Sequence, residues 1–224
     1  KSRVIIFQNN DDKKFFEKKI IKKKSLVVPG SGVNYNDFDQ KKFPKQITFM
    51  MISRIIKHKG IENFFSVSKK ISQNNKNVKF IFVGKKQNNY SLNKNFIKTN
   101  AKACNVKLLK WGKDAKDLYK YCSIYVLPSK REGMSRTILE AMSAGRPIIT
   151  TNVPGCKDAV KDGYNGYLVK YNSDNSLLES VNRFIKKPKL IKKFGLNSRK
   201  RVIKYFDVNI INKKIISLLI SKRK

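Results

Sequence analysis

The chain has 224 residues and a mass of 25.9 kDa, with 40% hydrophobic and 29% charged residues, which is enough for one full-sized α/β domain or two small ones. This composition excludes a disordered or fibrous chain, and the longest apolar stretches fall short of the ~20 residues that a membrane-spanning helix needs. The formal net charge of +36 predicts attraction to phosphates, nucleic acid or anionic lipid, although a solvated Lys-rich surface without a dedicated site also explains it.

Short apolar runs alternate with segments of helical periodicity along most of the chain. The runs that predict strands are 3–7, 26–28, 47–52, 78–83, 106–109, 124–127, 148–150 and 167–169. Helices are predicted over 11–23, 61–74, 92–103, 114–121, 135–144 and 156–161, and three more follow from residue 175, the last at 208–221. This alternation predicts a Rossmann-like α/β fold: a parallel sheet with helices on both faces, followed by C-terminal helices. Residues 29–46, with their Gly, Pro and Asn, form the best candidate hinge.

Cysteine and histidine usage argues against several kinds of chemistry. Cys104, Cys122 and Cys156 are far apart and lack C-x-x-C spacing, which favours a reducing, cytoplasmic compartment over a disulfide framework. The single histidine, His58, lies between two lysines, so neither a zinc site nor a Ser-His-Asp triad is expected. The start of the chain does not resemble a signal peptide.

In an open parallel sheet, ligands bind beyond the carboxyl ends of the strands, where helix N-termini suit phosphate. The sequence has no G-x-G-x-x-G after a strand and no G-x-x-x-x-G-K-[ST], so neither the usual dinucleotide site nor a P-loop is predicted. Three strand-to-helix loops remain as candidates, and the third is the most informative: 53–60 (SRIIKHKG), 84–87 (GKKQ) and 128–135 (PSKREGMS).

The third loop and the helix after it carry two glutamates, Glu132 and Glu140, with seven residues between them. Gly133 lets the backbone approach a ligand closely, and a helix that begins near Ser135 offers free N–H donors to a phosphate. Glu140 can then reach hydroxyls beside the phosphate, and a carboxylate suits a ribose diol. The plain alternative is an exposed loop carboxylate and a surface Glu140 that pairs with Arg136 at i, i+4.

This segment resembles glycosyltransferase family 4, retaining enzymes of the GT-B architecture, through its E-x(7)-E element, EAMSAGRPIITT and VPG. The resemblance extends to VIIFQNNDDKKFF (4–16), VVPGSGVN (27–34), the loop with Arg54 and Lys59, FIFVG (80–84), VKLLKWG (106–112) and DGYNGYLV (162–169). It implies the C-terminal half of a GT-B fold. Residues 1–33 are then a remnant of the N-terminal acceptor domain with the hinge, 34–206 the Rossmann-like donor-binding domain, and 207–224 a C-terminal helix.

The resemblance also implies roles for individual residues. Arg54 and Lys59 would neutralise the donor diphosphate, and Glu132 would hold the transferred sugar, so these three are the expected catalytic residues. The other implied donor-binding residues are Glu140 at the ribose, Gly133, Met134, Ser135, Thr137, Gly84, Trp111 and Gly112. No metal and no cofactor is expected, because the nucleotide diphosphate sugar is a substrate.

Some positions depart from the family pattern. Ser53 stands where the family usually has Gly, while His58 and Lys85 stand where acidic residues are common. Asp37-Phe38-Asp39 spells the D-x-D of another glycosyltransferase architecture and is interpreted as chance. Because the N-terminal half is missing, the chain alone is expected to bind a donor without efficient transfer.

The resulting hypothesis is transfer of a sugar, with retention, from a UDP-linked donor to a glycan or lipid-linked acceptor in bacterial-type surface polysaccharide synthesis. The place of action would be the cytoplasm, with peripheral attachment to the anionic inner face of the membrane. Two alternatives stay open: a non-catalytic nucleotide-sugar-binding fragment, and a basic nucleic-acid-binding protein. No helix-turn-helix, RNP or zinc pattern supports the latter, so no specific nucleic acid is expected.

Overall fold

The computed structural model describes residues 4–19, 25–40, 42–85, 92–112 and 115–220. Its strands are β1 (Ile5–Phe7), β2 (Ser25–Val27), β3 (Ile47–Arg54), β4 (Val78–Lys85), β5 (Val106–Lys110), β6 (Ile124–Leu127), β7 (Ile148–Thr151) and β8 (Gly166–Val169). Its α-helices are α1 (Asn10–Lys19), α2 (Ile61–Asn74), α3 (Lys94–Ala103), α4 (Ala115–Leu118), α5 (Arg136–Ser143), α6 (Asp174–Lys186), α7 (Lys189–Tyr205) and α8 (Val208–Ile220).

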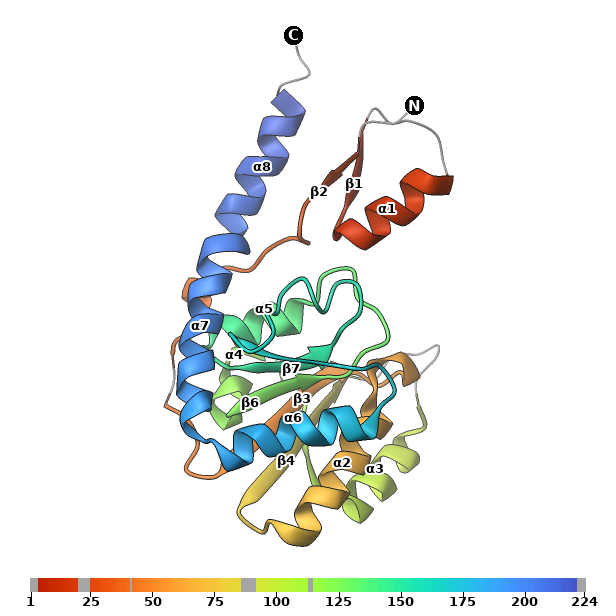
Figure 1. Ribbon diagram of the computed structural model, residues 1–224, viewed down its shortest axis with the longest axis vertical. Coiled ribbons are helices and arrows are strands. Elements are labelled where there is room, and N and C mark those ends of the chain that lie inside the picture. The colour runs from red at the N-terminus through yellow and green to blue at the C-terminus, as the bar shows by residue number, and fades with distance from the viewer. Residues whose placement is uncertain (1–3, 20–24, 41, 86–91, 113–114, 221–224) are drawn as a thin grey trace.

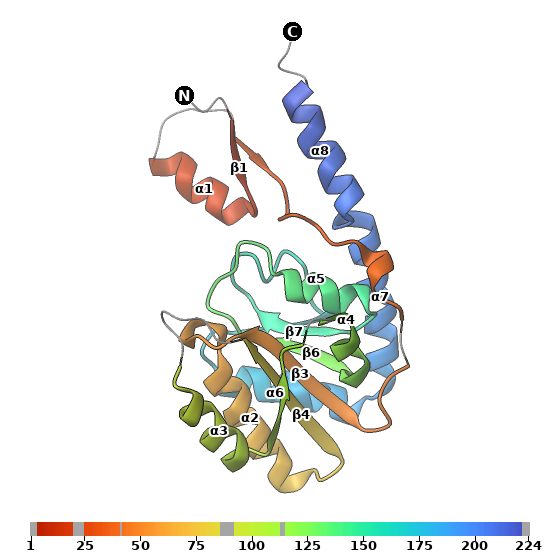
Figure 2. The same ribbon diagram turned by 180° about the vertical axis from the view of Figure 1, so that it is seen from behind.

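The main sheet has six parallel strands in the order β5-β4-β3-β6-β7-β8, with helices on both faces (Figures 1 and 2). The chain builds outward from β3 to β5 and then returns to build β6 to β8 on the other side. The order therefore reverses between β3 and β6, and at such a point the loops at the carboxyl ends diverge and leave a crevice for a ligand.

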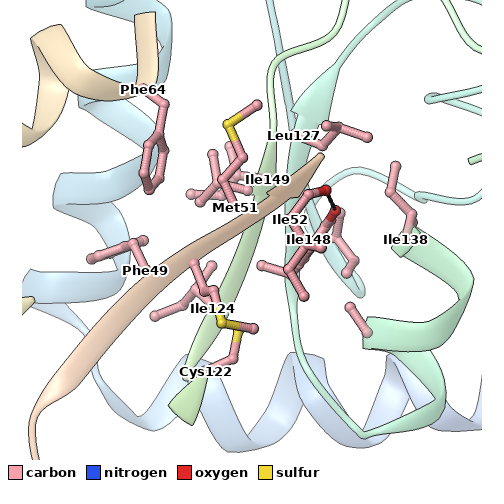
Figure 3. Close-up of a cluster of buried hydrophobic side chains, with 14 of the residues drawn as sticks. Phe49, Met51, Ile52, Phe64, Cys122, Ile124, Leu127, Ile138, Ile148 and Ile149 are labelled. Carbon is pink, nitrogen blue, oxygen red and sulfur yellow. Dashed lines mark hydrogen bonds between the residues drawn. The ribbon is translucent and has the colours of Figure 1, made fainter. Parts of the chain in front are cut away.

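The core forms because the central strands are apolar on both faces, as a covered parallel sheet requires. All four residues of β6 are buried, and so are six of the eight in β3. Figure 3 shows Phe64 of α2 and Ile138 of α5 on opposite sides of these strands. On the α2 face, Phe64 meets Phe80 of β4 edge-on, with ring centroids 5.6 Å apart.

A smaller unit precedes the main sheet. Strands β1 and β2 form their own two-stranded parallel sheet, connected through α1, and this unit lies over the carboxyl edge of the main sheet (Figure 1). The predicted hinge then returns to the body, where the Val33 N–H donates to the Phe206 carbonyl (2.9 Å) and the Val208 N–H to the Val33 carbonyl (3.1 Å). Since these contacts define no independent folding units, the domain division at residues 33 and 206 stays a prediction.

The expected fold class and all eight strands are confirmed, with strand ends displaced by at most two residues. One helix prediction is wrong: of residues 156–161, 156–159 form turns and 160–161 are irregular. Gly155 precedes them with a φ of +76°, and its N–H donates to the Asp158 carboxylate (2.8 Å), which favours a turn over a helical start. The segment predicted at 114–121 has α4, of four residues, followed by a 3₁₀ turn, Tyr119–Tyr121.

Other helix ends shift slightly. The predicted helix 11–23 ends at Lys19 among the described residues. Predicted positions 3, 20–23, 86–87, 114 and 221 lie outside the described residues. Within the described ranges, no helix has both the length and the apolarity needed to cross a bilayer.

Candidate functional site

A cavity of about 200 Å³ opens at the carboxyl edge of the main sheet, where the strand order reverses. It brings together six of the residues predicted from the sequence, namely Arg54, Lys59, Trp111, Glu132, Ser135 and Thr137. These come from the end of β3 and from the loops that follow β3, β5 and β6, with the start of α5. Ile52, Ser53, Leu127 and Arg136 complete the lining.

An ion pair lies at the base of this cavity. The Lys59 ammonium is 2.5 Å from Glu132 Oε1, and only 11% and 13% of the two side chains are exposed. A charge-assisted hydrogen bond with so little water around it is stronger than a surface ion pair, and losing either partner would leave the other charge poorly compensated. Lys59 and Glu132, two of the three predicted catalytic residues, therefore neutralise each other's charge.

The turn that carries Lys59 is fixed against the Glu132 loop. Lys57–Lys59 form a 3₁₀ turn that ends at Gly60, which has a φ of +73°. A Cβ on Gly60 would lie 2.2 Å from the Pro128 carbonyl oxygen, so only glycine fits there. The His58 carbonyl accepts from the Lys130 N–H (2.8 Å), while the His58 side chain is exposed, in keeping with its interpretation as a loop residue.

A third loop, after β7, supports the other side of Glu132. The Glu132 N–H donates to the Pro154 carbonyl at 3.1 Å. Gly155 packs so closely that a Cβ on it would lie 2.1 Å from the Glu132 carbonyl oxygen. Three loops from separate strands thus position one carboxylate.

Gly133 and Met134 do not line the cavity with Glu132 and instead contact the N-terminal unit. The Asn9 side chain donates to the Gly133 carbonyl (3.0 Å), and a Cβ on Gly133 would lie 2.0 Å from Gln8 Oε1. Met134 packs against Gly30, where an added Cβ would be 2.9 Å from the Met134 Cβ. Their predicted sugar-binding role stays a prediction.

The start of α5 faces the cavity with polar groups. Ser135 is the N-cap but makes no side-chain capping bond, and its Oγ lies 3.3 Å from Thr137 Oγ1. The buried Tyr125 hydroxyl is 2.7 Å from Thr137 Oγ1 and 2.9 Å from the Ile52 carbonyl. Burial raises the pKa of Tyr125 well above its ordinary value, so this hydroxyl stays a donor. The helix N-terminus adds a partial positive charge that favours an anion.

Glu140 is buried beside this cavity and opens into a different one. Its carboxylate accepts from Arg136 Nε (3.0 Å) and from the Tyr119 hydroxyl (3.1 Å). It lines a second cavity of about 460 Å³ between α5, the hinge and the start of α8, and Arg136 lines both cavities. The i, i+4 pair that the plain alternative expected is present, but Glu140 is not a surface residue, since only 12% of its side chain is exposed against 76% for Arg136.

Three further predicted positions lie at the carboxyl ends of β4 and β5: Gly84 within β4, and Trp111 and Gly112 directly after β5. Trp111 is 37% exposed at the cavity, with the Lys85 ammonium 5.7 Å from its ring centroid. Gly84 is a packing position, because a Cβ would be 2.8 Å from Ile55 Cγ1, and it does not line the cavity. Gly112 is exposed with open space around it and also lies outside the lining.

Sequence reasoning missed several residues that shape the site. Gly155 could have been found from its place in the VPG motif, and Arg136 from its neighbours in the E-x(7)-E element. Gln8 and Asn9 lie in the segment 4–16 that resembles the family, but nothing local predicts their contacts with Gly133. Tyr125 reaches the site through contacts with residues distant in the chain.

The described residues contain no group of three or more His, Cys, Asp or Glu side chains that could hold a metal ion. Asp37 of the D-x-D sequence instead lies 3.5 Å from the Lys116 ammonium.

The fold has close structural counterparts. The chain superposes with a TM-score of 0.88 on sucrose-phosphate synthase from Thermosynechococcus elongatus, at 20% identity over 99% of this chain and 58% of that one. Anabaena Alr3699/HepE in complex with UDP gives a TM-score of 0.85, at 21% identity over 98% of this chain and 64% of that one. The fold class is therefore that of the GT-B glycosyltransferase structures.

The profile of the family described as "Glycosyl transferases group 1" matches residues 34–201, and the chain belongs to this family. It is 31% identical over 160 residues to the capsular polysaccharide biosynthesis glycosyltransferase CapM of Staphylococcus aureus. The aligned region covers 71% of this chain and 42% of CapM. It is 27% identical over 210 residues to N,N'-diacetylbacillosaminyl-diphospho-undecaprenol alpha-1,3-N-acetylgalactosaminyltransferase of Campylobacter jejuni. The aligned region covers 87% of this chain and 54% of that enzyme. The chain spans about half the length of these relatives.

Proposed function

We propose that this protein binds a nucleotide diphosphate sugar, UDP-linked, and takes part in sugar transfer to a glycan or lipid-linked acceptor in surface polysaccharide synthesis. The names of its relatives support this, since one acts in capsular polysaccharide biosynthesis and another, from Escherichia coli, is a UDP-Gal:alpha-D-GlcNAc-diphosphoundecaprenol alpha-1,3-galactosyltransferase. The structural neighbour HepE has been solved with UDP and with UDP-glucose. We further propose that transfer retains the anomeric configuration, as in glycosyltransferase family 4.

One observation carries the proposal: the cavity at the sheet's reversal point combines three cations (Arg54, Lys59 and Arg136), a carboxylate and a helix N-terminus. Arg54 and Lys59 supply positive charge where a diphosphate would sit, and α5 adds the partial charge of its N–H groups. A cavity of this composition suits a diphosphate better than a neutral ligand.

The roles then follow from the charges. When the donor binds, its diphosphate competes with Glu132 for the Lys59 ammonium, and Glu132 becomes available to the sugar. Arg54 and Lys59 neutralise the charge that grows on the leaving diphosphate, an electrostatic contribution of the kind that typically supplies a few kcal/mol in transition states. We propose that these two side chains provide the required positive charge without a metal ion. Glu140 lines the neighbouring cavity, which shares Arg136 with the donor cavity, and is proposed to accept hydrogen bonds from the ribose hydroxyls of a donor that spans both.

The test is titration calorimetry with a panel of UDP, GDP, ADP and UDP-sugars, repeated on Arg54→Ala and Glu140→Ala. Each variant is expected to lose about 10-fold or more in affinity, because a charge-assisted contact is removed. Lys193→Ala, at an exposed position on α7, is the control and should bind as the wild type does. Wild-type affinity in both site variants would reject the site.

Transfer needs a separate measurement. The chain is incubated with the nucleotide sugar that binds and with a synthetic lipid-linked acceptor, and the anomeric configuration of the product is read by NMR. An inverted product would contradict retention. UDP binding without any transfer would support the alternative, a non-catalytic nucleotide-sugar-binding chain.

A further inference from the structure

A large cavity lies far from the candidate donor site. It has a volume of about 780 Å³ and is lined by the first residues of β3, β4 and β5, at the amino edge of the main sheet. In Figure 2 this edge points away from the β1–β2 unit. The donor cavity opens at the opposite, carboxyl edge, so the two sites share no residue.

Five lysines border this cavity, which we call the lysine groove: Lys45, Lys76, Lys79, Lys102 and Lys107. All five are exposed. In the part of the chain that the structure describes, the groove is lined by no Asp, Glu or Arg, and none of the five lysines forms an ion pair. A concave surface with uncompensated charges of one sign concentrates counter-ions.

Strand register explains how the lysines come together. Thr48 pairs with Lys79 and Ile81 with Lys107 across neighbouring parallel strands, so these side chains share one face of the sheet. Tyr125, which contacts α5, lies on the same face of the sheet. The helix α4 has only four residues and does not cover the amino ends of β3, β4 and β5 on this face. Lys79 is exposed although Val78 and Phe80, on either side of it, are buried.

The composition of the groove points to a polymeric ligand. An exposed lysine contributes little to a single ion pair in water, so one isolated anion would be held weakly. A polymeric ligand with several anionic groups contacts several lysines at once. After the first contact forms, each further contact is intramolecular and raises the overall affinity.

Its other groups favour an acidic glycan over a nucleic acid. Tyr121 borders the groove with 46% of its surface exposed and offers a ring face and a hydroxyl to a pyranose, while Gln46 and Asn105 offer amides to sugar hydroxyls. Nucleic-acid grooves instead use arginine forks and several stacking aromatics. This groove has no arginine, and of its two aromatic residues Phe80 is buried and only Tyr121 is exposed. We propose that the lysine groove is an accessory binding site for an acidic polysaccharide chain, separate from the site of sugar transfer.

The test measures binding of the full chain to hexagalacturonate, with neutral maltohexaose and oligothymidylate as comparison ligands. The wild type is expected to bind hexagalacturonate more tightly than either, with an affinity that falls as salt rises. Lys79→Glu/Lys107→Glu should lose about 10-fold or more, and Tyr121→Ala several-fold. Thermal unfolding confirms that each variant is folded, and unchanged UDP binding shows that the opposite edge is intact.

The matched control is Lys193→Glu/Lys200→Glu, which makes the same charge change at exposed positions on α7. It should change hexagalacturonate affinity less than about twofold. Equal losses in both double variants would assign the binding to net charge and overturn the proposal. Equal affinity for maltohexaose, or tighter binding of oligothymidylate that is lost in Lys79→Glu/Lys107→Glu, would also overturn it.

Discussion

Glu132 is held by backbone contacts that depend on single glycines. Gly155 has a φ of +76°, and its α-carbon hydrogen occupies the place where a Cβ would lie 2.1 Å from the Glu132 carbonyl oxygen. Gly163 has a similar φ of +68° but no atom within 4 Å of the same position. An alanine at Gly163 would therefore meet only backbone strain, whereas an alanine at Gly155 would meet the same strain and a steric clash.

We expect Gly155→Ala to cost about 2–4 kcal/mol of unfolding free energy and to weaken UDP binding, because the loop with Glu132 must move. Gly163→Ala should cost only about 1 kcal/mol, from strain alone, and leave UDP binding unchanged. Denaturant unfolding and calorimetry measure the two effects. Equal costs for both variants would contradict the steric role of Gly155.

The buried thiol of Cys122 makes the unfolding free energy decrease at alkaline pH. Burial raises the pKa of its thiol to about 12, against a weaker opposing effect of Arg146. The unfolded thiol ionises near ~8.5, so between there and about 12 the unfolded state binds fewer protons than the native state, and stability falls as pH rises. Below pH ~8.5 this contribution is fully present.

Replacing Cys122 by Ala should flatten the fall in unfolding free energy above pH ~9 by up to ~1.4 kcal/mol per pH unit. Cys156, whose pKa burial raises to about 11, leaves a residual slope of the same sign above pH ~8.5. The buried Tyr119 and Tyr125, whose pKa values are also raised, add to that slope above pH ~10. Cys104→Ala, at a half-buried thiol, should flatten the slope less. Denaturant unfolding across this pH range measures the slopes, and an unchanged slope in Cys122→Ala would refute the assignment.

At the scale of elements, α5 is fixed to the sheet by tyrosine hydroxyls as well as by apolar packing. Tyr125 on β6 reaches the Ile52 carbonyl on β3 and Thr137 on α5 with one hydroxyl. Tyr119, in the turn after α4, reaches Glu140 on the same helix. The polar start of α5 is thereby positioned over the end of β3.

Tyr125→Phe removes the hydroxyl and keeps the ring. It should cost about 1–2 kcal/mol of unfolding free energy, since the buried Ile52 carbonyl loses a donor and the Thr137 hydroxyl loses an acceptor, and should lower UDP affinity several-fold. Tyr121→Phe, at an exposed tyrosine, should change neither quantity. If Tyr125→Phe kept full stability in denaturant unfolding, the coupling of α5 to β3 would not depend on this hydroxyl.

At the scale of the whole molecule, the net charge of +36 dominates long-range interactions. We propose that it holds the protein at an anionic membrane surface, where well-placed lysines contribute ~1 kcal/mol each. Sedimentation with vesicles of phosphatidylglycerol and phosphatidylcholine should show binding that weakens as salt rises, and little binding to phosphatidylcholine alone. Retention on anionic vesicles that does not change at high salt would count against this attachment.

Much of the architecture was predictable because it depends on local pattern. The apolar run of β6 and the periodicity of α2 are visible in the sequence, and they predict strands and helices wherever neighbouring side chains alone decide burial. The error at 156–161 has the same origin, since the pattern showed a few apolar residues but not the turn that Gly155 begins. The site was predictable only where a motif marked it, as in the E-x(7)-E element.

By itself the sequence determined the α/β class, the order of the strands along the chain and the residue types available to bind an anion. The tertiary structure decided which of these residues meet. The reversal of strand order between β3 and β6 places Lys59 against Glu132. The packing of the N-terminal unit places Gln8 against Gly133, and the hinge and α8 enclose the second cavity with Glu140. Such contacts join residues far apart in the chain, and local periodicity carries no information about them because they depend on how whole elements pack.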